Sequence, residues 1–194
     1  MNHLAHFALA GSDPELLVGG FLGDYVKGRL AGRFPAQIEK GIKLHRAIDR
    51  FTDEHPVTRT SARRLPRRFH RYGGIIADIT YDHLLAVNWH QYYDTSLDDF
   101  SRSTLTTLLE YCDYLPEDAL RTATRMHELN SLAGYSERVF LERSLGYLST
   151  RLTRDNPLDE AATEVMHHLD SMTDDLEQFY PELRLFCDEW RQNH

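Results

Sequence analysis

The chain has 194 residues, a length that predicts one domain, residues 1–194, with a sizeable core. Its net charge of −8 argues against a general nucleic-acid-binding protein, and no apolar run approaches the roughly 20 residues needed to span a bilayer. The first residues lack the basic and apolar segments of a signal peptide, and the two cysteines form no CxxC motif. We therefore expect a reduced, cytoplasmic protein that binds neither membrane nor nucleic acid.

Helix signals recur along the chain, whereas strand signals are scarce. Ser12-Asp13-Pro14-Glu15 predicts a helix start, with a capping side chain before a proline and an acid in the first turn. The residues that follow include Gly19, Gly20 and Gly23, which cost helix stability. Small residues at these positions permit a close approach of another backbone near Asp24.

Further helices follow from the pattern of apolar residues and prolines. They are expected over residues 35–53, from Pro56 to a break at Leu65-Pro66, and over 74–89, 95–114, 116–129 and 135–152. A turn at 154–157 precedes a long last helix, 159–190, which Pro181 is expected to kink or break. The pattern predicts an all-α globular domain and does not determine the oligomeric state.

Two acids interrupt an apolar helix face in the segment 74–89. Asp78 and Asp82 lie one turn apart on a stripe formed with Ile75, Ile79, Ala86 and Trp89. Burying a carboxylate lowers the stability of the fold by roughly several kcal/mol unless the group is paired or binds a metal ion. Asp78 and Asp82 are therefore candidate metal ligands; alternatively, each pairs with a buried arginine or caps a backbone group.

The helix before this stripe offers nitrogen and oxygen ligands. His45 and Asp49 lie at positions i and i+4 and therefore share a helix face, which suits two ligands of one ion, although such a pair is more often a surface ion pair. His6 in the apolar first segment and Asp24 after Gly23 are further candidates; alternatively, they are a core histidine and a turn aspartate. His83 points about 100° away from Asp82 and would support the site rather than bind the ion.

Imidazole and carboxylate ligands without thiolates favour Mn²⁺, Mg²⁺ or Fe²⁺ over structural zinc. The chain contains no HExxH motif, no phosphate-binding P-loop motif and no nucleophile elbow, which argues against zincin, P-loop and serine-hydrolase chemistry. A metal ion that polarises a phosphoryl oxygen is the simplest remaining chemistry. Arg46 would then bind phosphate oxygens, or else it is an ordinary surface charge.

Positive charge is concentrated in one part of this acidic chain. Residues 27–77 carry 13 lysines or arginines against four acids, and the segment His55–Ala77 has six arginines and no acid. Such a patch indicates an anionic partner approaching one face, or a solvated face balanced by the acidic second half of the chain.

Several short motifs occur in order along the whole chain. They are Asn2-x-Leu4-Ala5-His6, Gly23-Asp24, His45-Arg46-x-Ile48-Asp49-x-x-Thr52-Asp53, Asp78-x-x-x-Asp82-His83-x-Leu85-x-x-x-Trp89 and Phe179-Tyr180-Pro181. Together they resemble the acyl carrier protein phosphodiesterase family, also called acyl carrier protein hydrolase. His3 stands where the opening motif is expected to have an aromatic residue, a departure that we expect to affect packing rather than chemistry.

The resemblance implies an all-helical fold distantly like that of the HD phosphohydrolases, with Mn²⁺ as the preferred ion. It implies hydrolysis of the phosphodiester that joins 4′-phosphopantetheine to the carrier protein's serine. The adjacent His-Asp doublet of HD enzymes is absent; the chain offers His45 with Asp49 and the reversed Asp82-His83.

The expected site can be stated by residue. The predicted metal ligands are His6, Asp24, His45, Asp49, Asp78 and Asp82. The predicted catalytic residues are Asp24, His45, Arg46 and His83, and holo-acyl carrier protein, a small acidic partner, is expected to dock on Arg63, Arg64, Arg67 and Arg68. The alternatives are a phosphohydrolase for a nucleotide or other small phosphoester, and a non-catalytic helical module that binds an acidic protein.

Overall fold

Local sequence determines where most helices begin and end. The computed structural model describes residues 1–194, which form ten α-helices, five short 3-10 helices and no strand. The α-helices are α1 (His3–Leu9), α2 (Pro14–Leu22), α3 (Ala36–Glu54), α4 (Pro56–Arg64), α5 (Gly73–Val87), α6 (Leu97–Glu110), α7 (Glu117–Glu128), α8 (Arg138–Arg151), α9 (Ala161–His167) and α10 (Leu169–Asn193). At the start of α2 the Asp13 side chain accepts hydrogen bonds from the backbone N–H groups of Glu15 and Leu16, as the sequence predicts.

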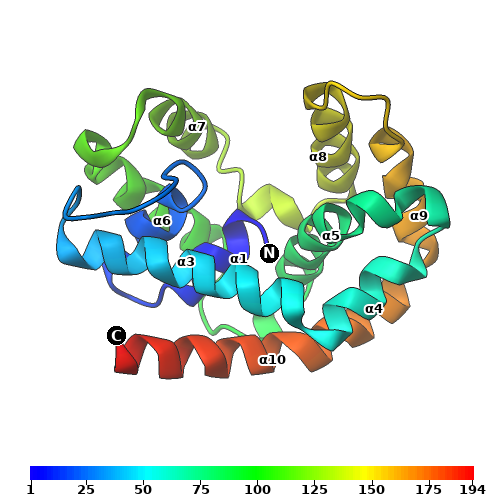
Figure 1. The fold of residues 1–194 in the computed structure, drawn as a ribbon, viewed down its shortest axis with the longest axis horizontal. Coiled ribbons are helices and arrows are strands. Elements are labelled where there is room, and N and C mark those ends of the chain that lie inside the picture. The colour runs from blue at the N-terminus through cyan, green and yellow to red at the C-terminus, as the bar shows by residue number, and fades with distance from the viewer.

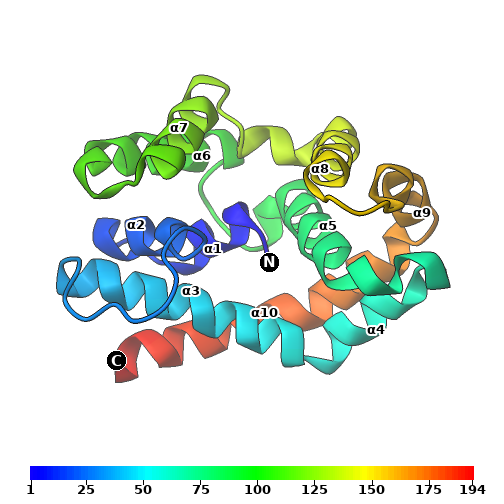
Figure 2. The same ribbon diagram turned by 45° about the horizontal axis from the view of Figure 1, so that its top comes forward.

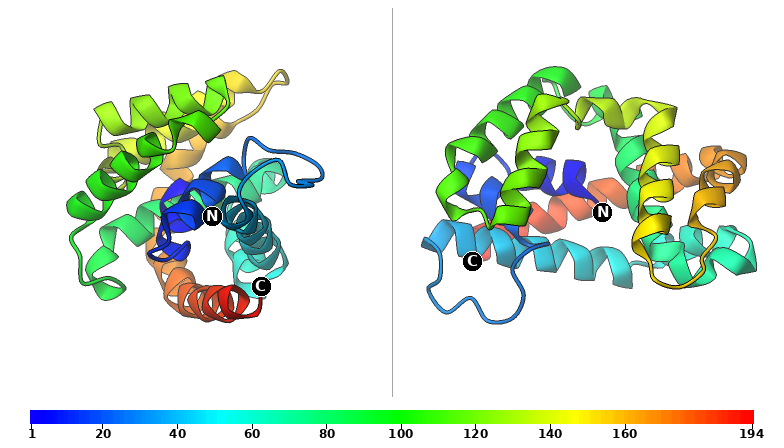
Figure 3. Two further views of the ribbon diagram at one scale, coloured as in Figure 1. Left: turned by 90° about the vertical axis from the view of Figure 1, so that its left-hand side faces the viewer. Right: turned by 90° about the horizontal axis from the view of Figure 1, so that it is seen from above.

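The helices are stacked in layers (Figures 1 and 2). In Figure 2, α1, α2 and α5 lie between α6, α7 and α8 on one side and α3, α4 and α10 on the other. One core cluster of 46 buried residues connects these layers. The amino terminus lies inside the circle of helices in both views of Figure 3, and Met1 is only 6% exposed. The first residues of the chain are therefore part of the core.

Helices α2 and α3 pack with their backbones nearly in contact, which confirms the close approach predicted from the glycines. A methyl group added to Gly19 would lie 2.7 Å from the Cα of Gly41, and one added to Gly41 would lie 2.8 Å from the Cα of Gly19. At Gly23 an added methyl group would overlap the imidazole of His45. These glycines place the end of α2 directly beside the face of α3 that carries His45.

The break in the last predicted helix lies at a different residue from the one expected. The break in the last helix falls at His168, between α9 and α10, and α10 runs uninterrupted through Pro181. Helix α9 packs on α8, whereas α10 packs on α3, α4 and α5, so the chain turns where its packing partner changes. Pro181 removes one backbone hydrogen bond, but the neighbouring Phe179, Tyr180 and Leu183 are fully buried and keep the helix in place.

Helix α1 is absent from the sequence prediction, although Asn2 offered a signal. Its side chain accepts a hydrogen bond from the backbone N–H of His3 at 2.9 Å, which makes it an N-cap. The all-α prediction is confirmed, while the likeness to HD phosphohydrolases stays a prediction. None of the helices combines the length and apolarity needed to cross a membrane.

Candidate metal centre

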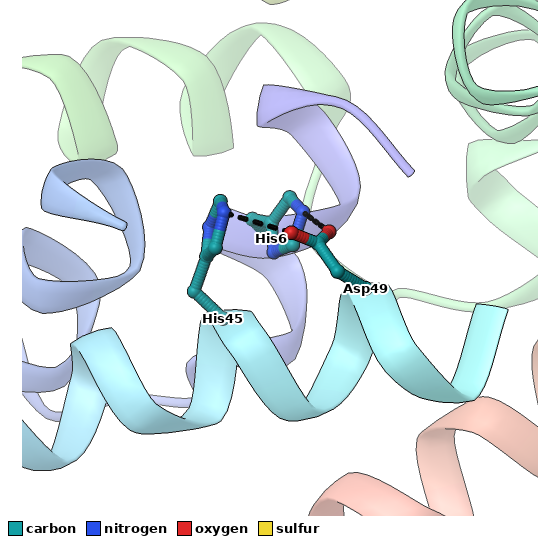
Figure 4. Close-up of side chains that lie close together, drawn as sticks. All are labelled: His6, His45 and Asp49. Carbon is teal, nitrogen blue, oxygen red and sulfur yellow. Dashed lines mark ion pairs between the residues drawn. The ribbon is translucent and has the colours of Figure 1, made fainter. Parts of the chain in front are cut away.

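Three side chains from two helices converge inside the fold, and we call them the His–Asp centre: His6 on α1, and His45 and Asp49 on α3 (Figure 4). Nε2 of His45 lies 3.2 Å from one carboxylate oxygen of Asp49, and Nε2 of His6 lies 3.2 Å from the other. One ligand atom from each residue lies within 4.8 Å of the other two. The two imidazoles stack with their centroids 3.9 Å apart.

The packing of α2 on α3 fixes the orientation of His45. Its Nδ1 lies 2.8 Å from the carbonyl oxygen of Gly20, which can only accept, so Nδ1 carries the proton and donates. In the neutral ring, Nε2 then presents a lone pair to the carboxylate of Asp49. Two lone pairs facing each other require a cation or a proton between them.

This donor set fits a divalent metal ion. A metal-binding histidine usually donates its other N–H to a backbone carbonyl, as His45 does. Nδ1 of His6, the ring nitrogen that does not face Asp49, is buried without a hydrogen-bond partner, so His6 lacks the outer contact that His45 makes. Asp49 is 46% exposed, so the centre is open to solvent on one side. Two imidazoles and a carboxylate with an open side suit a catalytic rather than a structural ion.

The environment shifts the pKa values at the centre in opposite directions. Burial lowers the pKa of His6 to about 4, and the neighbouring His45 adds to this effect. Burial alone would raise the pKa of Asp49, but the contacts with His45 and His6 outweigh it, and the pKa of Asp49 is lowered. The neutral imidazole and the ionised carboxylate are the metal-binding forms of these groups.

Asp24 borders the centre, and His3 lies next to it. One carboxylate oxygen of Asp24 is 3.7 Å from Nε2 of His45, and the other is 3.6 Å from Nδ1 of His3. The ring of His3 also packs against Phe21, with centroids 5.6 Å apart. The sequence predicts an effect of His3 on packing rather than chemistry; the structure places its imidazole beside a candidate functional carboxylate as well.

Asp78 and Asp82 are not brought to the His–Asp centre. Asp78 accepts a hydrogen bond at 2.7 Å from the Met1 ammonium group. Asp82 is fully buried and accepts from the backbone N–H groups of Asn2 at 2.9 Å and Leu4 at 2.8 Å.

For Asp82 this arrangement corresponds to the alternative in which a buried acid caps backbone groups, whereas the half-buried Asp78 pairs with the Met1 ammonium group. The predicted apolar stripe is also incomplete, because Ile75 is 41% exposed. Burial raises the pKa of Asp82 to about 7, although the ammonium and backbone donors act in the opposite direction. The two acids hold the start of α1, and through it His6, in place, so we leave them out of the proposed ligand set.

Two predicted catalytic residues also lie apart from the His–Asp centre. Nδ1 of His83 donates to the carbonyl oxygen of Tyr135 at 2.8 Å, on the side of α5 that faces the 3-10 helix Ala133–Ser136. The guanidinium of Arg46 donates to the carbonyl oxygens of Val26 at 2.8 Å and Gly28 at 3.0 Å. Arg46 therefore fixes the segment that follows Asp24.

The four arginines predicted to dock a partner, here called the arginine face, lie on α4 and on the 3-10 helix Arg67–Tyr72. Arg64 forms two hydrogen bonds of 2.9 Å with Asp175, and Arg68 pairs with Glu164 at 2.7 Å. These pairs connect the basic segment to the acidic last helices. Of these four arginines, Arg63 and Arg67 are exposed and form no ion pair, so they present free positive charge.

A cleft of about 150 Å³ lies between the end of α3, α4 and the first half of α5. It is lined by Thr52, Asp53, Thr58, Arg59, Ala62, Gly74, Ala77 and Asp78. Asp53 lies one turn beyond Asp49 on α3, and the hydroxyl of Thr52 is buried without a partner. The cleft therefore continues the functional face of α3 towards α4.

The lowered pKa of His6 predicts a specific pH dependence of stability in the metal-free protein. Because the unfolded histidine takes up a proton near pH 6.5 and the folded one only near pH 4, the stability contributed by His6 is complete above pH 6.5 and is lost as the pH falls through this window. The free energy of unfolding, measured in urea with EDTA, should fall relative to that of His6→Gln by about 1 kcal/mol per pH unit. Parallel pH profiles for the two proteins would contradict this prediction.

Comparison with known proteins identifies the family. The family model described as "Acyl carrier protein phosphodiesterase" matches residues 1–183. A protein of that name from Photorhabdus laumondii is 29% identical over 182 residues, covering 93% of this chain and 92% of its own length. Proteins of the same name from Klebsiella pneumoniae and Yersinia pestis are each 28% identical and cover 94% and 93% of this chain and 95% and 94% of their own lengths.

No solved structure matches the chain. The family match nevertheless extends from the first residue to beyond the middle of α10, so it includes the His–Asp centre, the cleft and the arginine face. The chain therefore belongs to the acyl carrier protein phosphodiesterase family.

Proposed function

We propose that this protein is a metal-dependent phosphodiesterase that hydrolyses holo-acyl carrier protein to apo-carrier protein and 4′-phosphopantetheine. The observation that carries the metal dependence is the clustering of His6, His45 and Asp49, whose ligand atoms lie within 4.8 Å of one another on an open side of the fold. The names of the relatives support the carrier protein as the substrate.

In this proposal His6, His45 and Asp49 hold a divalent ion, preferably Mn²⁺ and otherwise Mg²⁺ or Fe²⁺. The bound ion supplies Lewis-acid activation of the phosphoryl group. Asp24, with a side chain that is 49% exposed beside His45, accepts a proton from the attacking water. As the water oxygen bonds to phosphorus, the bond to the serine oxygen breaks, and that oxygen takes up a proton from a nearby acid or from water. Arg46 keeps Asp24 in position by binding the carbonyl oxygens of the segment that follows it.

The carrier protein docks on the arginine face in this proposal, and its prosthetic arm runs along the cleft beside α3 and α4 to the His–Asp centre. An acidic helical protein complements free positive charge, and such complementarity chiefly raises the association rate. Only Arg63 and Arg67 are free of internal ion pairs, so they are expected to contribute more to docking than Arg64 and Arg68.

Reversing the free charges should separate docking from chemistry. We expect the double variant Arg63→Glu/Arg67→Glu to raise KM for holo-carrier protein about tenfold or more while leaving the hydrolysis of a small phosphodiester unchanged. Steady-state kinetics on both substrates measure this. The matched control is Arg125→Glu/Arg143→Glu, which changes the net charge equally at exposed arginines elsewhere. An equal loss on both substrates would exclude the docking role.

The proposal as a whole is tested by mass spectrometry of holo-carrier protein incubated with the purified protein and Mn²⁺. We expect a loss of the phosphopantetheine mass that EDTA and Asp49→Asn both abolish. Mn²⁺ binding without this loss would favour the small-phosphoester alternative. Failure to bind any divalent ion would favour the non-catalytic helical module.

A further inference from the structure

The cleft beside α3 and α4 contains the end of a sequence motif that the proposed mechanism leaves without a role. The motif begins with His45 and includes Asp49 of the His–Asp centre, and it ends with Thr52-Asp53, which line the cleft. Asp53 follows Asp49 by four residues and is therefore displaced about 6 Å along the same face of α3. A ligand that begins at Asp49 and continues along α3 reaches the cleft after one helical turn.

Small residues on the two helices opposite α3 provide the space in the cleft. Ala62 of α4 and Gly74 and Ala77 of α5 line it, and a methyl group added to Gly74 would have no atom within 4 Å. Ligand sites are typically lined by apolar groups, with a few polar groups that fix the orientation of the ligand. The cleft therefore suits a narrow chain with aliphatic substituents.

Three polar side chains of the cleft have hydrogen-bonding groups that the fold does not use. Thr52 is only 3% exposed, and its hydroxyl is buried without a partner. Asp53 is exposed and its carboxylate forms no ion pair, while Arg59 donates Nε–H to the backbone carbonyl oxygen of Asp53 at 3.0 Å and keeps its other donors free. Most buried hydroxyls in folded proteins are hydrogen-bonded, so an unpartnered one in the wall of a cleft indicates a ligand.

The charge at the cleft favours a neutral chain over a second phosphate group. Asp53 and Asp78 both line it, and of these two only Asp78 is paired, with the Met1 ammonium group. Partial burial and then the Asp78 carboxylate raise the pKa of Asp53, because the two negative charges repel each other. Another anion meets the same repulsion, which Arg59 offsets only in part, whereas a hydroxyl or an amide N–H can donate to the carboxylate.

We propose that the cleft binds the pantoyl part of the phosphopantetheine arm, with the Asp53 carboxylate as acceptor and the Thr52 hydroxyl as donor. This role of the cleft rests on the proposed function and names the part of the substrate that it recognises. In phosphopantetheine a methylene and a dimethyl-substituted carbon separate the phosphate oxygen from the carbon that bears the hydroxyl, and the first amide follows directly. The hydroxyl and amide therefore suit Asp53 and Thr52, and the two methyl groups suit the small residues opposite.

Thr52→Val tests this subsite, because valine keeps the shape of threonine and removes a hydroxyl that has no partner in the fold. We expect isothermal titration of the Mn²⁺-loaded wild type to show about tenfold or more tighter binding of 4′-phosphopantetheine than of inorganic phosphate. Thr52→Val should lower this ratio about three- to tenfold, the effect of one neutral hydrogen bond, and should unfold in urea at the same or a higher midpoint. A merely structural role of Thr52 would lower the midpoint and leave the ratio unchanged.

Asp53→Asn is the second variant, at an exposed residue whose replacement does not disturb the core. It should also lower the ratio, because it weakens a charge-assisted hydrogen bond to the arm and removes a charge that repels free phosphate. The matched controls are Thr60→Val and Glu54→Gln, which change exposed side chains of α4 and α3 outside the cleft. Both controls should keep the wild-type ratio.

Equal affinity of the wild type for the two ligands, or a ratio that neither cleft variant changes, would overturn the subsite and leave the proposed function intact. Failure of the Mn²⁺-loaded wild type to bind either ligand would overturn both. A ratio lowered in both variants, without hydrolysis of holo-carrier protein by the wild type, would support the subsite and reject the proposed substrate.

Discussion

Asp49→Asn should abolish both divalent-ion binding and phosphodiester hydrolysis while leaving the helical fold intact. Asp49 is the member of the His–Asp centre that faces both imidazoles, at 3.2 Å each. An asparagine keeps the shape but replaces one carboxylate oxygen with a donor and removes the negative charge that balances the ion. We expect the affinity for Mn²⁺ to fall by a factor on the order of 100 or more.

Isothermal titration with Mn²⁺ and the mass-resolved assay measure the two losses separately. The control is Glu54→Gln, which removes an exposed carboxylate from the same helix outside the His–Asp centre and the cleft. Circular dichroism should be alike in the two variants, because Asp49 is half exposed and its helix is held by buried neighbours such as Ile48. If Asp49→Asn bound Mn²⁺ as tightly as the wild type, the proposed ion site would be wrong.

Asp82→Ala should destabilise the protein by about 4 kcal/mol, since each unsatisfied buried donor costs about 1–3 kcal/mol. Asp82 is the fully buried acceptor for the backbone N–H groups of Asn2, Leu4 and Ala5 at the start of α1. Without the Asp82 carboxylate these three N–H groups have no acceptor, and the start of α1 is no longer attached to α5. Urea unfolding followed by circular dichroism measures the change.

Asp82→Asn distinguishes this capping role from metal ligation, because it keeps an acceptor oxygen and the size of the side chain. We expect it to recover much of the lost stability and to bind Mn²⁺ with near-wild-type affinity. A variant that folds like the wild type but loses Mn²⁺ binding would instead make Asp82 a ligand.

The helices were largely predictable because their starts and stops depend on local chemistry. Asp13 with Pro14 begins α2, and the Leu65-Pro66 pair ends α4, as capping and proline sterics require. The break at His168 was not predictable in this way, because it reflects a change of packing partner between α9 and α10. Local signals carry no information about which helix a neighbouring segment will contact.

In the candidate site, too, the contacts within one helix were predictable from the sequence, whereas the contacts between helices were not. Helical spacing placed His45 and Asp49 on one face, but only the tertiary fold brings His6 to them. Periodicity also showed that Asp82 would be buried without showing what it would meet, and its partner is the chain's own amino-terminal segment. The pairing of Arg64 with Asp175 likewise depends on residues more than a hundred positions apart.

The glycine contact between α2 and α3 also determines which glycines of the chain tolerate substitution. In a saturation library, Gly19, Gly23 and Gly41 should accept almost no other residue, although none of them offers a side chain to an ion, because any larger residue there separates α2 from α3 or displaces His45. By contrast, Gly74 and Gly146 lie in helices with open space where a methyl group would go. Alanine should be enriched at Gly146 in the interior of α8, where the replacement gains up to about 1 kcal/mol of helix propensity, and less so at Gly74, which lies in the first turn of α5 and lines the cleft.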